Sequence, residues 1–286
     1  MRREGNRSGI QVIQVPYDSG RKNVGMGMGP AHLVIHGRGL LGKAAVSQIE
    51  VEELPFEPGT TFRVLRALSE EVGSAVRRGC FPLVLAGGCI SCVGTLAGLD
   101  AKPVAVVWMD AHGDFNTPET TLSGFLDGMA LAAATGRCWQ NLTSSVAGFR
   151  PVCEENVILI GARDLDPEER KLLEGSAISW IQTATVRERG AKNALAHALE
   201  GLKADQIYLH IDLDVLDRSA ANVNRFSSAG GLTVTELLQT VRVVAAARAV
   251  VAAAITAYDP SYDNDGKALR AGMELIKELI SIDQPS

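Results

Sequence analysis

The sequence predicts an α/β fold in which a parallel sheet is covered by helices on both faces. Short apolar runs rich in β-branched residues recur along the chain, and longer amphipathic segments lie between them. Strands that alternate with helices form parallel sheets whose two faces are buried. The 286 residues contain no repeat, linker or low-complexity tract, so we expect one domain spanning residues 1–286.

Six short apolar runs are expected to form the strands. They are residues 10–15, 82–86, 103–109, 157–161, 206–211 and 249–258. Four amphipathic segments are expected to form helices, at residues 61–78, 167–174, 185–202 and 233–247. Pro167 suits the first position of its helix, and Arg248 interrupts an alanine-rich stretch where a helix ends and the last strand begins. Ligands of such sheets bind at the carboxyl ends of strands, so functional residues are expected there.

Composition argues against several classes of function. The net charge is −5 and the isoelectric point is about 5.6, so the chain lacks the basic surface typical of nucleic-acid binding. The N-terminal stretch lacks the apolar core of a signal peptide, and no run approaches the roughly 18 apolar residues of a membrane span. Five cysteines, an odd number, are typical of reduced thiols. We therefore expect a cytoplasmic protein without nucleic-acid or membrane partners.

Acidic residues and a histidine follow the strand expected at residues 103–109. Asp110, His112 and Asp114 stand two positions apart. In an extended backbone, residues two apart point to the same side. These three side chains can therefore converge just beyond the strand end.

A second strand end repeats this arrangement with Asp212 and Asp214. Like charges about 4 Å apart repel by roughly 4 kcal/mol at an effective dielectric of about 20. A pair of divalent cations would relieve the repulsion, and mixed carboxylate and imidazole ligands suit manganese. Either motif alone is also compatible with a solvated cluster of loop carboxylates. Their occurrence at two strand ends favours a dinuclear metal site.

These residues also carry a resemblance to a known family. Asp110-Ala-His-Gly-Asp-Phe-Asn-Thr-Pro118 and Asp212-Leu-Asp-Val-Leu-Asp217 resemble the two metal signatures of the ureohydrolase superfamily, which contains arginases and agmatinases. Residues 25–30, 123–128, 161–167 and 230–233 resemble further family motifs in the same order. The resemblance implies a three-layer α/β/α fold with a parallel sheet of about eight strands. It also implies metal-dependent hydrolysis of linear amidine carbon–nitrogen bonds.

The first metal histidine of the family is missing from the chain. An ungapped alignment over residues 84–98 places Cys89 at the histidine's position and Gly88 at that of the family's aspartate. A thiolate is a competent metal ligand, so we expect Cys89 to bind metal. Two alternatives stay open, an inert buried cysteine and a redox pair with Cys92. The loss of the carboxylate at Gly88 predicts weaker support of the ligand beside it.

The family pattern implies two sets of metal ligands. One ion would be held by Cys89, Asp110, Asp114 and Asp212, and the other by Asp110, His112, Asp212 and Asp214. Soft sulfur suits manganese poorly, so we expect two Mn²⁺ ions per chain with the Cys89-side ion weak or partly occupied. Asp114, bound by one ion in the family, is expected to carry the proton to the leaving nitrogen.

Two further departures from arginases concern the substrate. Asp127 stands where arginases carry a histidine that shuttles protons, and an ordinary aspartate pKa of about 3.9 predicts a poor acid at neutral pH. Ala257 stands where the family places a glutamate that holds the guanidinium. A cationic guanidinium would lose its main ion pair there.

The residues that would hold the amino-acid end of the substrate match the arginase pattern. Asn116, Thr121 and Ser123 match the positions that bind the α-carboxylate, and Asp166 and Glu169 match those that face the α-amine. An alternative is that Asp166 is only a carboxylate at a helix N-terminus, beside Pro167.

These matches predict a substrate that resembles arginine at its α-carbon but has a less basic head group. Nω-Hydroxy-L-arginine fits, with L-ornithine and hydroxyurea as products. The chain is similar to a branch that hydrolyses this compound in antibiotic biosynthesis and that also has cysteine for the first histidine. The alternatives are an ordinary arginase and a catalytically decayed binding protein. Family members are commonly trimers or hexamers, so the resemblance also implies a homo-oligomer.

Three other polar residues are expected to be structural. His210 lies inside a strand and is expected to pack in the core. Asp217 is expected to cap the turn after the second signature through the backbone. Arg163 is expected to pair with a carboxylate beneath the substrate loop.

Overall fold

A computed structural model describes residues 9–99 and 102–283 of the chain. Within these residues, eight strands form one parallel sheet in the order β4-β1-β5-β10-β9-β6-β7-β8. The strands are β1 (Gly9–Val15), β4 (Ala45–Gln48), β5 (Cys80–Ala86), β6 (Val104–Met109), β7 (Val157–Ile160), β8 (Ser179–Ile181), β9 (Gln206–Asp212) and β10 (Ala249–Thr256). A separate antiparallel pair contains β2 (Tyr17–Asp18) and β3 (Arg21–Lys22).

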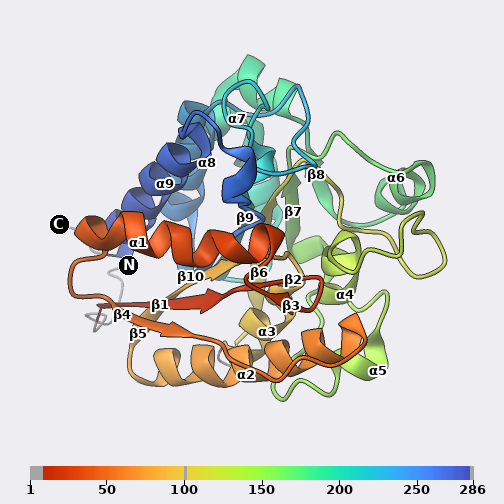
Figure 1. The fold of residues 1–286 in the computed structure, drawn as a ribbon. Coiled ribbons are helices and arrows are strands. Elements are labelled where there is room, and N and C mark those ends of the chain that lie inside the picture. Colours follow the sequence, from red (N-terminus) through yellow and green to blue (C-terminus); the bar gives the residue numbers. More distant parts are fainter. Residues whose placement is uncertain (1–8, 100–101, 284–286) are drawn as a thin grey trace.

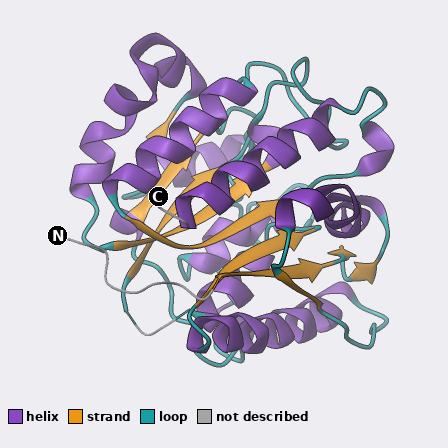
Figure 2. Cartoon of the chain, turned by 90° about the vertical axis from the view of Figure 1, so that its left-hand side faces the viewer, coloured by secondary structure: helices purple, strands orange, loops and turns teal. Residues whose placement is uncertain are grey.

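Helices cover both faces of the sheet, so the molecule has three layers (Figures 1 and 2). One face packs against α1 (Gly29–Leu41), α7 (Thr183–Gly201), α8 (Val234–Ala247) and α9 (Lys267–Asp283). The other packs against α2 (Glu57–Arg77), α3 (Ser91–Gly98) and α4 (Ala130–Ala134). The remaining helical turns are α5 (Gln140–Thr143), α6 (Pro167–Glu174), η1 (Gly25–Met28), η2 (Asp127–Met129), η3 (Glu154–Asn156), η4 (Leu213–Val215) and η5 (Pro260–Tyr262).

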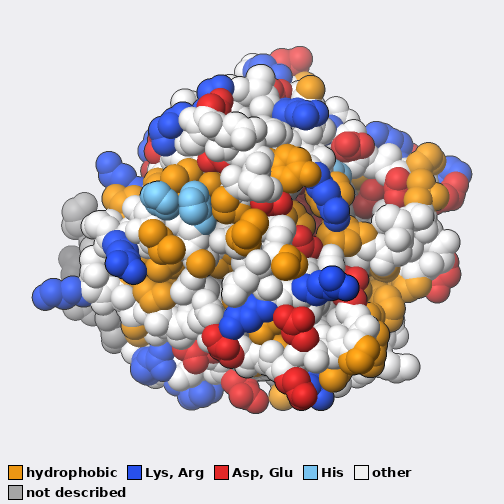
Figure 3. Space-filling model, in the orientation of Figure 1, with side chains coloured by type: hydrophobic (Ala, Val, Ile, Leu, Met, Phe, Trp, Pro, Cys, Tyr) orange, Lys and Arg blue, Asp and Glu red, His pale blue; other side chains and the backbone are white. Residues whose placement is uncertain are grey.

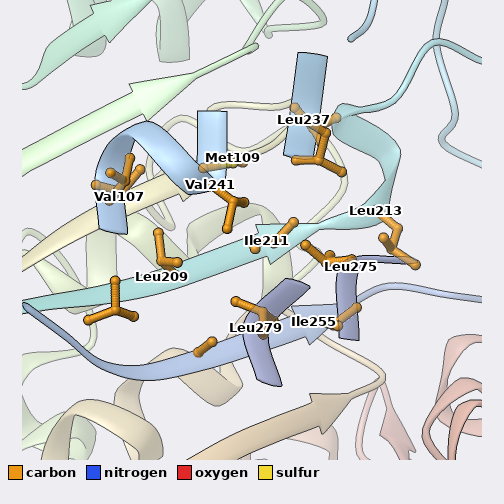
Figure 4. Packing of buried hydrophobic residues seen from close by; sticks show 14 of the residues in the cluster. Val107, Met109, Leu209, Ile211, Leu213, Leu237, Val241, Ile255, Leu275 and Leu279 are labelled. Atoms are coloured by element: carbon orange, nitrogen blue, oxygen red, sulfur yellow. The ribbon is translucent and has the colours of Figure 1, made fainter. Parts of the chain in front are cut away.

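Two hydrophobic clusters fill the space between the layers because alternate residues of a strand point to opposite faces. In β9, Leu209 and Ile211 pack toward α8 and α9, as Figure 4 shows. Tyr208, one position away, belongs to the cluster under α2 and α3. His210 shares the side of Tyr208 and is fully buried, as expected for a core residue.

The structure confirms the predicted fold class and adds elements that the sequence patterns did not reveal. Strand β4 was not predicted because it is a mostly exposed edge strand without an apolar run. Strand β8 is too short, at three residues, to produce a recognisable pattern. Helix α9 was also not predicted, although its Leu275 and Leu279 complete the core shown in Figure 4.

The described part of the chain contains no helix that is both long and apolar enough to span a bilayer. On the face drawn in Figure 3, basic and acidic side chains are interspersed.

Candidate metal centre and substrate pocket

The carboxyl ends of three strands, β5, β9 and β6, bring the predicted metal ligands together. Strands β5, β10, β9 and β6 are consecutive neighbours in the sheet. Cys89 follows β5, Asp110 follows β6, and Asp212 is the last residue of β9. Parallel strands end at the same edge of a sheet, so residues distant in the sequence meet there.

One group of candidate ligands consists of Asp110, His112 and Asp214. Their ligand atoms all lie within 4.8 Å of one another. The His112 Nδ1 atom is 3.2 Å from Asp110 Oδ1 and 3.4 Å from Asp214 Oδ2. The backbone supports the carboxylates, because the His112 N–H donates to Asp110 Oδ1 and the Ala111 N–H donates to Asp214 Oδ1.

Cys89 takes part in a second group, with Asp110 and Asp114. Its Sγ atom lies 3.1 Å from Asp212 Oδ2 and 4.0 Å from Asp110 Oδ2. The thiol of Cys92 instead donates to the carbonyl of Ala130 at 3.6 Å, and both cysteines are free. Cys89 thus belongs to the core cluster under α2 and α3, but its sulfur contacts carboxylates and it is not bonded to Cys92. These contacts fit the ligand interpretation better than the inert cysteine or the redox pair.

The electrostatics of the cluster reflect buried charges of like sign. Burial and the charge of Asp214 raise the pKa of Asp110 to about 6. Burial and Asp110 raise the pKa of Asp114 well above its usual range, and burial and Asp214 do the same for Asp212. Burial opposes ionisation of Asp214, but the charge and hydrogen bond of His112 lower its pKa to about 2. A cation between these carboxylates would favour their ionised forms.

Two features of Asp114 fit a metal ligand. Its Oδ2 atom is buried and has no hydrogen-bond partner among the described residues. Its backbone has a φ of +48°, a conformation that a non-glycine residue adopts at a cost and that is common at functional sites. Together with the carboxylate, imidazole and thiol donors around it, this unpaired oxygen fits a divalent cation.

The loop after β9 is held by hydrogen bonds between two side chains, those of Arg163 and Asp217, and the backbone. Arg163 donates to six carbonyl oxygens, those of Gly161, Asp214, Val215, Leu216, Ser228 and Ala229. The prediction that Arg163 pairs with a carboxylate was wrong, because its guanidinium lies among backbone carbonyls that follow β7 and β9 and those of the loop at residues 228–229. Asp217 accepts hydrogen bonds from the backbone of Ser219, Gly230 and Gly231, which confirms its capping role.

A cavity of about 280 Å³ opens above the candidate metal centre. The predicted metal ligands that line it are Cys89, His112, Asp114, Asp212 and Asp214. All the predicted substrate-binding residues line it as well, namely Asn116, Thr121, Ser123, Asp166 and Glu169. Asp110 is buried and is not among the lining residues.

The two acidic residues expected to face the α-amine are also part of a helix N-terminus. Asp166 is the N-cap of α6, and Glu169 Oε2 accepts from the Asp166 N–H at 3.2 Å. Asn116 Nδ2 donates to Asp166 Oδ2 at 3.1 Å, and the Phe115 N–H donates to Glu169 Oε1. Burial raises the pKa of Glu169 to about 7. Asp166 therefore caps the N-terminus of α6 and also lines the pocket.

Asp127 is buried beside the loop that carries Cys89. Its Oδ1 atom accepts from the Ile90 N–H at 2.9 Å. A Cβ atom added to Gly88 would lie 2.6 Å from Asp127 Oδ1, so the carboxylate of Asp127 fills the space beside Gly88. Through its bond to Ile90, this carboxylate supports the loop next to Cys89. Burial raises the pKa of Asp127 to about 7. The expectation of a poor acid at neutral pH is therefore wrong, because it used the pKa of an exposed aspartate.

Aromatic side chains form a part of the pocket wall that sequence reasoning missed. Phe125 and Phe226 both line the cavity, and their ring centroids lie 5.5 Å apart. The ring of Phe226 is 6.1 Å from that of His112, and the Arg225 guanidinium lies 4.5 Å above the Phe226 ring. Phe226 lies in the loop between the second metal signature and Gly230, where no local pattern marks a pocket residue.

The chain's similarity to known proteins agrees with this site. The family described as Arginase matches residues 8–281. A Bacillus caldovelox protein named Arginase is 32% identical, with 94% of this chain and 97% of that protein covered. A Bacillus subtilis protein of the same name is 31% identical, with 95% and 97% covered. The crystal structure of an arginase from Bacillus cereus superposes with a TM-score of 0.86 at 29% identity and covers 96% of this chain and 98% of its own. The chain therefore belongs to the arginase family, whose members are metal-dependent amidinohydrolases.

Proposed function

We propose that the protein hydrolyses the amidine carbon–nitrogen bond of an arginine-like amino acid, with Nω-hydroxy-L-arginine as its preferred substrate. The products would be L-ornithine and hydroxyurea. One observation carries the proposal: the pocket combines the predicted amino-acid-binding residues with a methyl group, that of Ala257, at the end of β10.

The head-group end of the pocket favours a weakly basic group. Ala257, Asn224 and Phe226 line it, and the Asn224 amide is engaged with the carbonyl of Ala257 at 2.8 Å. N-hydroxylation lowers the basicity of a guanidine, so the hydroxylated substrate depends less on a carboxylate partner. A cationic guanidinium that lacks such a partner would lose hydration energy on binding without an ion pair to offset the loss.

The amino-acid end of the substrate would be held by other residues of the same pocket. Asn116, Thr121 and Ser123 offer amide and hydroxyl donors to an α-carboxylate, and Asp166 and Glu169 offer acceptors to an α-ammonium group. Agmatine has no carboxylate and would leave the first three residues without a partner. This set therefore supports an amino-acid substrate.

We propose that Cys89, Asp110, Asp114 and Asp212 hold one Mn²⁺ ion and that Asp110, His112, Asp212 and Asp214 hold the other. When bound, the ions supply a water of lowered pKa and positive charge near the reacting carbon. The soft thiolate makes the Cys89 side the weaker site.

Two carboxyl groups of this chain can move protons around the reacting atoms. Asp114 lines the pocket, and with one carboxylate oxygen on the ion it could use the other to pass a proton to the leaving nitrogen. Asp127 also lines the pocket, and its pKa of about 7 suits exchange of protons at neutral pH.

Ordinary arginase activity is the second candidate, and the names of the relatives favour it. A protein prepared with manganese should be assayed for ornithine release from L-arginine, Nω-hydroxy-L-arginine and agmatine. We expect the largest kcat/KM for the hydroxylated compound. A larger value for L-arginine would establish the arginase instead. Fewer than one ion per chain and no turnover on any of the three would indicate a decayed binding protein.

We further propose the setting of the protein. The described cysteines are all free, which supports a reducing, cytoplasmic location. Both core clusters pack on one sheet, which supports a single domain. Cysteine at position 89 supports a place in antibiotic biosynthesis, and the family resemblance supports a homo-oligomer; gel filtration with light scattering tests the latter.

A further inference from the structure

A chain of buried polar side chains runs behind Cys89, on the side of the sheet that faces α2 and α3. The Cys89 Sγ atom lies 3.2 Å from Thr256 Oγ1. Thr256 Oγ1 lies 3.5 Å from His210 Nε2, and His210 Nδ1 lies 2.9 Å from the Tyr208 hydroxyl. Thr256, His210 and Tyr208 have no exposed surface at all. Polar groups buried this deeply destabilise the folded state unless they form hydrogen bonds, and these three lie in a line that leads to Cys89.

A metal-bound thiolate at Cys89 would set the direction of these hydrogen bonds, because a thiolate can only accept. A fully buried imidazole is neutral because an imidazolium would lose its hydration there, and a neutral ring has one donor and one acceptor. The Tyr208 hydroxyl can donate to Nδ1, which leaves Nε2–H to donate to Thr256 Oγ1. The hydroxyl hydrogen of Thr256 is then free to donate to the sulfur of Cys89. The same hydroxyl lies 3.5 Å from the carbonyl of Ile211, which is farther than the sulfur.

His210 also supports a second candidate ligand through Trp108. The Trp108 Nε1–H donates to Asp110 Oδ2 at 3.1 Å. The indole stacks on the ring of His210, with centroids 3.6 Å apart and planes 13° from parallel. Trp108 and His210 are partners in the register of β6 and β9, so the sheet itself holds the two rings together.

We infer that His210 is a positioning residue for the metal centre, which orients the Cys89 sulfur through Thr256 and the Asp110 carboxylate through Trp108. The inference rests on the proposed function, because it takes Cys89 and Asp110 as metal ligands. Outer hydrogen bonds fix the orientation of ligands, and their loss typically lowers metal affinity by about 10–100-fold.

The test separates the hydroxyl of Thr256 from its volume. Thr256→Val removes the donor to sulfur and keeps the shape, whereas Thr256→Ser keeps the donor. Thr240→Val is the matched control, because Thr240 is equally buried but donates to Glu236 within α8. His210→Phe keeps a ring against Trp108 and removes the donor to Thr256. Each variant is titrated with Mn²⁺ for stoichiometry and with Co²⁺ for the thiolate-to-cobalt absorption band, and its Tm is recorded without metal.

In Thr256→Val and His210→Phe we expect the Mn²⁺ ion on the Cys89 side, called the second ion here, to bind about 10–100-fold more weakly. The thiolate band should fall, and the ion on the His112 side should be retained. Thr256→Ser and Thr240→Val should titrate like the unaltered protein. Both valine variants remove a buried hydroxyl, so their Tm values without metal measure the cost of that loss. Weaker metal binding in Thr256→Val alone would then reflect lost support of the Cys89 ligand. An unaltered second ion and band in Thr256→Val would overturn the inference. Absence of the thiolate band in the unaltered protein would overturn the ligand role of Cys89, and the inference with it.

Discussion

Asp127 occupies the space beside Gly88 that any side chain at position 88 would need, since an added Cβ would lie 2.6 Å from Asp127 Oδ1. The two positions are 39 residues apart in the sequence, yet a Cβ at one would require the buried carboxylate at the other to shift. The two positions at which the chain departs from the family pattern are therefore in contact in three dimensions.

Gly88→Ala should displace Asp127 and the loop of Cys89. We expect a loss of about 1–3 kcal/mol in the free energy of unfolding, the usual cost of overpacking. Adding Asp127→Ala should recover part of this loss, because it removes the clashing group. Gly39→Ala is the control, since nothing lies within 4 Å of a Cβ at Gly39, and it should not destabilise the protein. Purely additive effects of the two changes, measured by denaturant unfolding, would contradict the coupling.

Asp127→Asn should change how stability depends on pH. An ordinary aspartate ionises near pH 3.8, whereas burial raises the pKa of folded Asp127 to about 7. Between these values the folded state retains a proton that the unfolded state has released. The contribution of Asp127 to stability is therefore fully present below about pH 4 and is lost as the pH rises toward 7. The metal-free variant should gain stability relative to the unaltered protein from pH 5 to pH 8, as thermal unfolding would measure. Parallel curves would refute the raised pKa.

Cys89→Ala should remove a ligand and lower the affinity for the second Mn²⁺ ion by about 100-fold or more, above the usual cost of losing an outer hydrogen bond. Cys89→His should strengthen this site instead, because imidazole suits manganese better than thiolate. Cys92→Ala provides the control, since that thiol is equally buried but bonds to the carbonyl of Ala130. Equal manganese content in Cys89→Ala and Cys92→Ala would exclude Cys89 as a ligand.

Ala257→Glu should shift specificity toward L-arginine. A carboxylate at the end of β10 would offer the guanidinium the ion pair that the methyl group cannot. We expect the ratio of kcat/KM for L-arginine to that for Nω-hydroxy-L-arginine to rise by about tenfold or more. Steady-state assays of ornithine release measure it. An unchanged ratio, with both substrates still turned over, would show that this position does not select the head group.

The sequence by itself determined the fold class and predicted which residues form the candidate site. Alternating apolar runs and amphipathic segments are local patterns, and they sufficed to predict the layers and most strands. Asp110, His112 and Asp114 could be grouped because they are close in the chain, and Asp212 and Asp214 because a strand end repeats the motif. The edge strand β4 and the short β8 carry too weak a pattern to be recognised in this way.

Only the tertiary structure decided what surrounds these residues. The pKa of Asp127 depends on burial, the partners of Arg163 are carbonyls from three separate segments, and Phe226 reaches the pocket from a loop without a motif. His210 looks like any core histidine in the sequence, because its links to Cys89 and Asp110 pass through residues of two other strands. Desolvation and long-range contacts exist only once the chain is packed, so no local pattern encodes them.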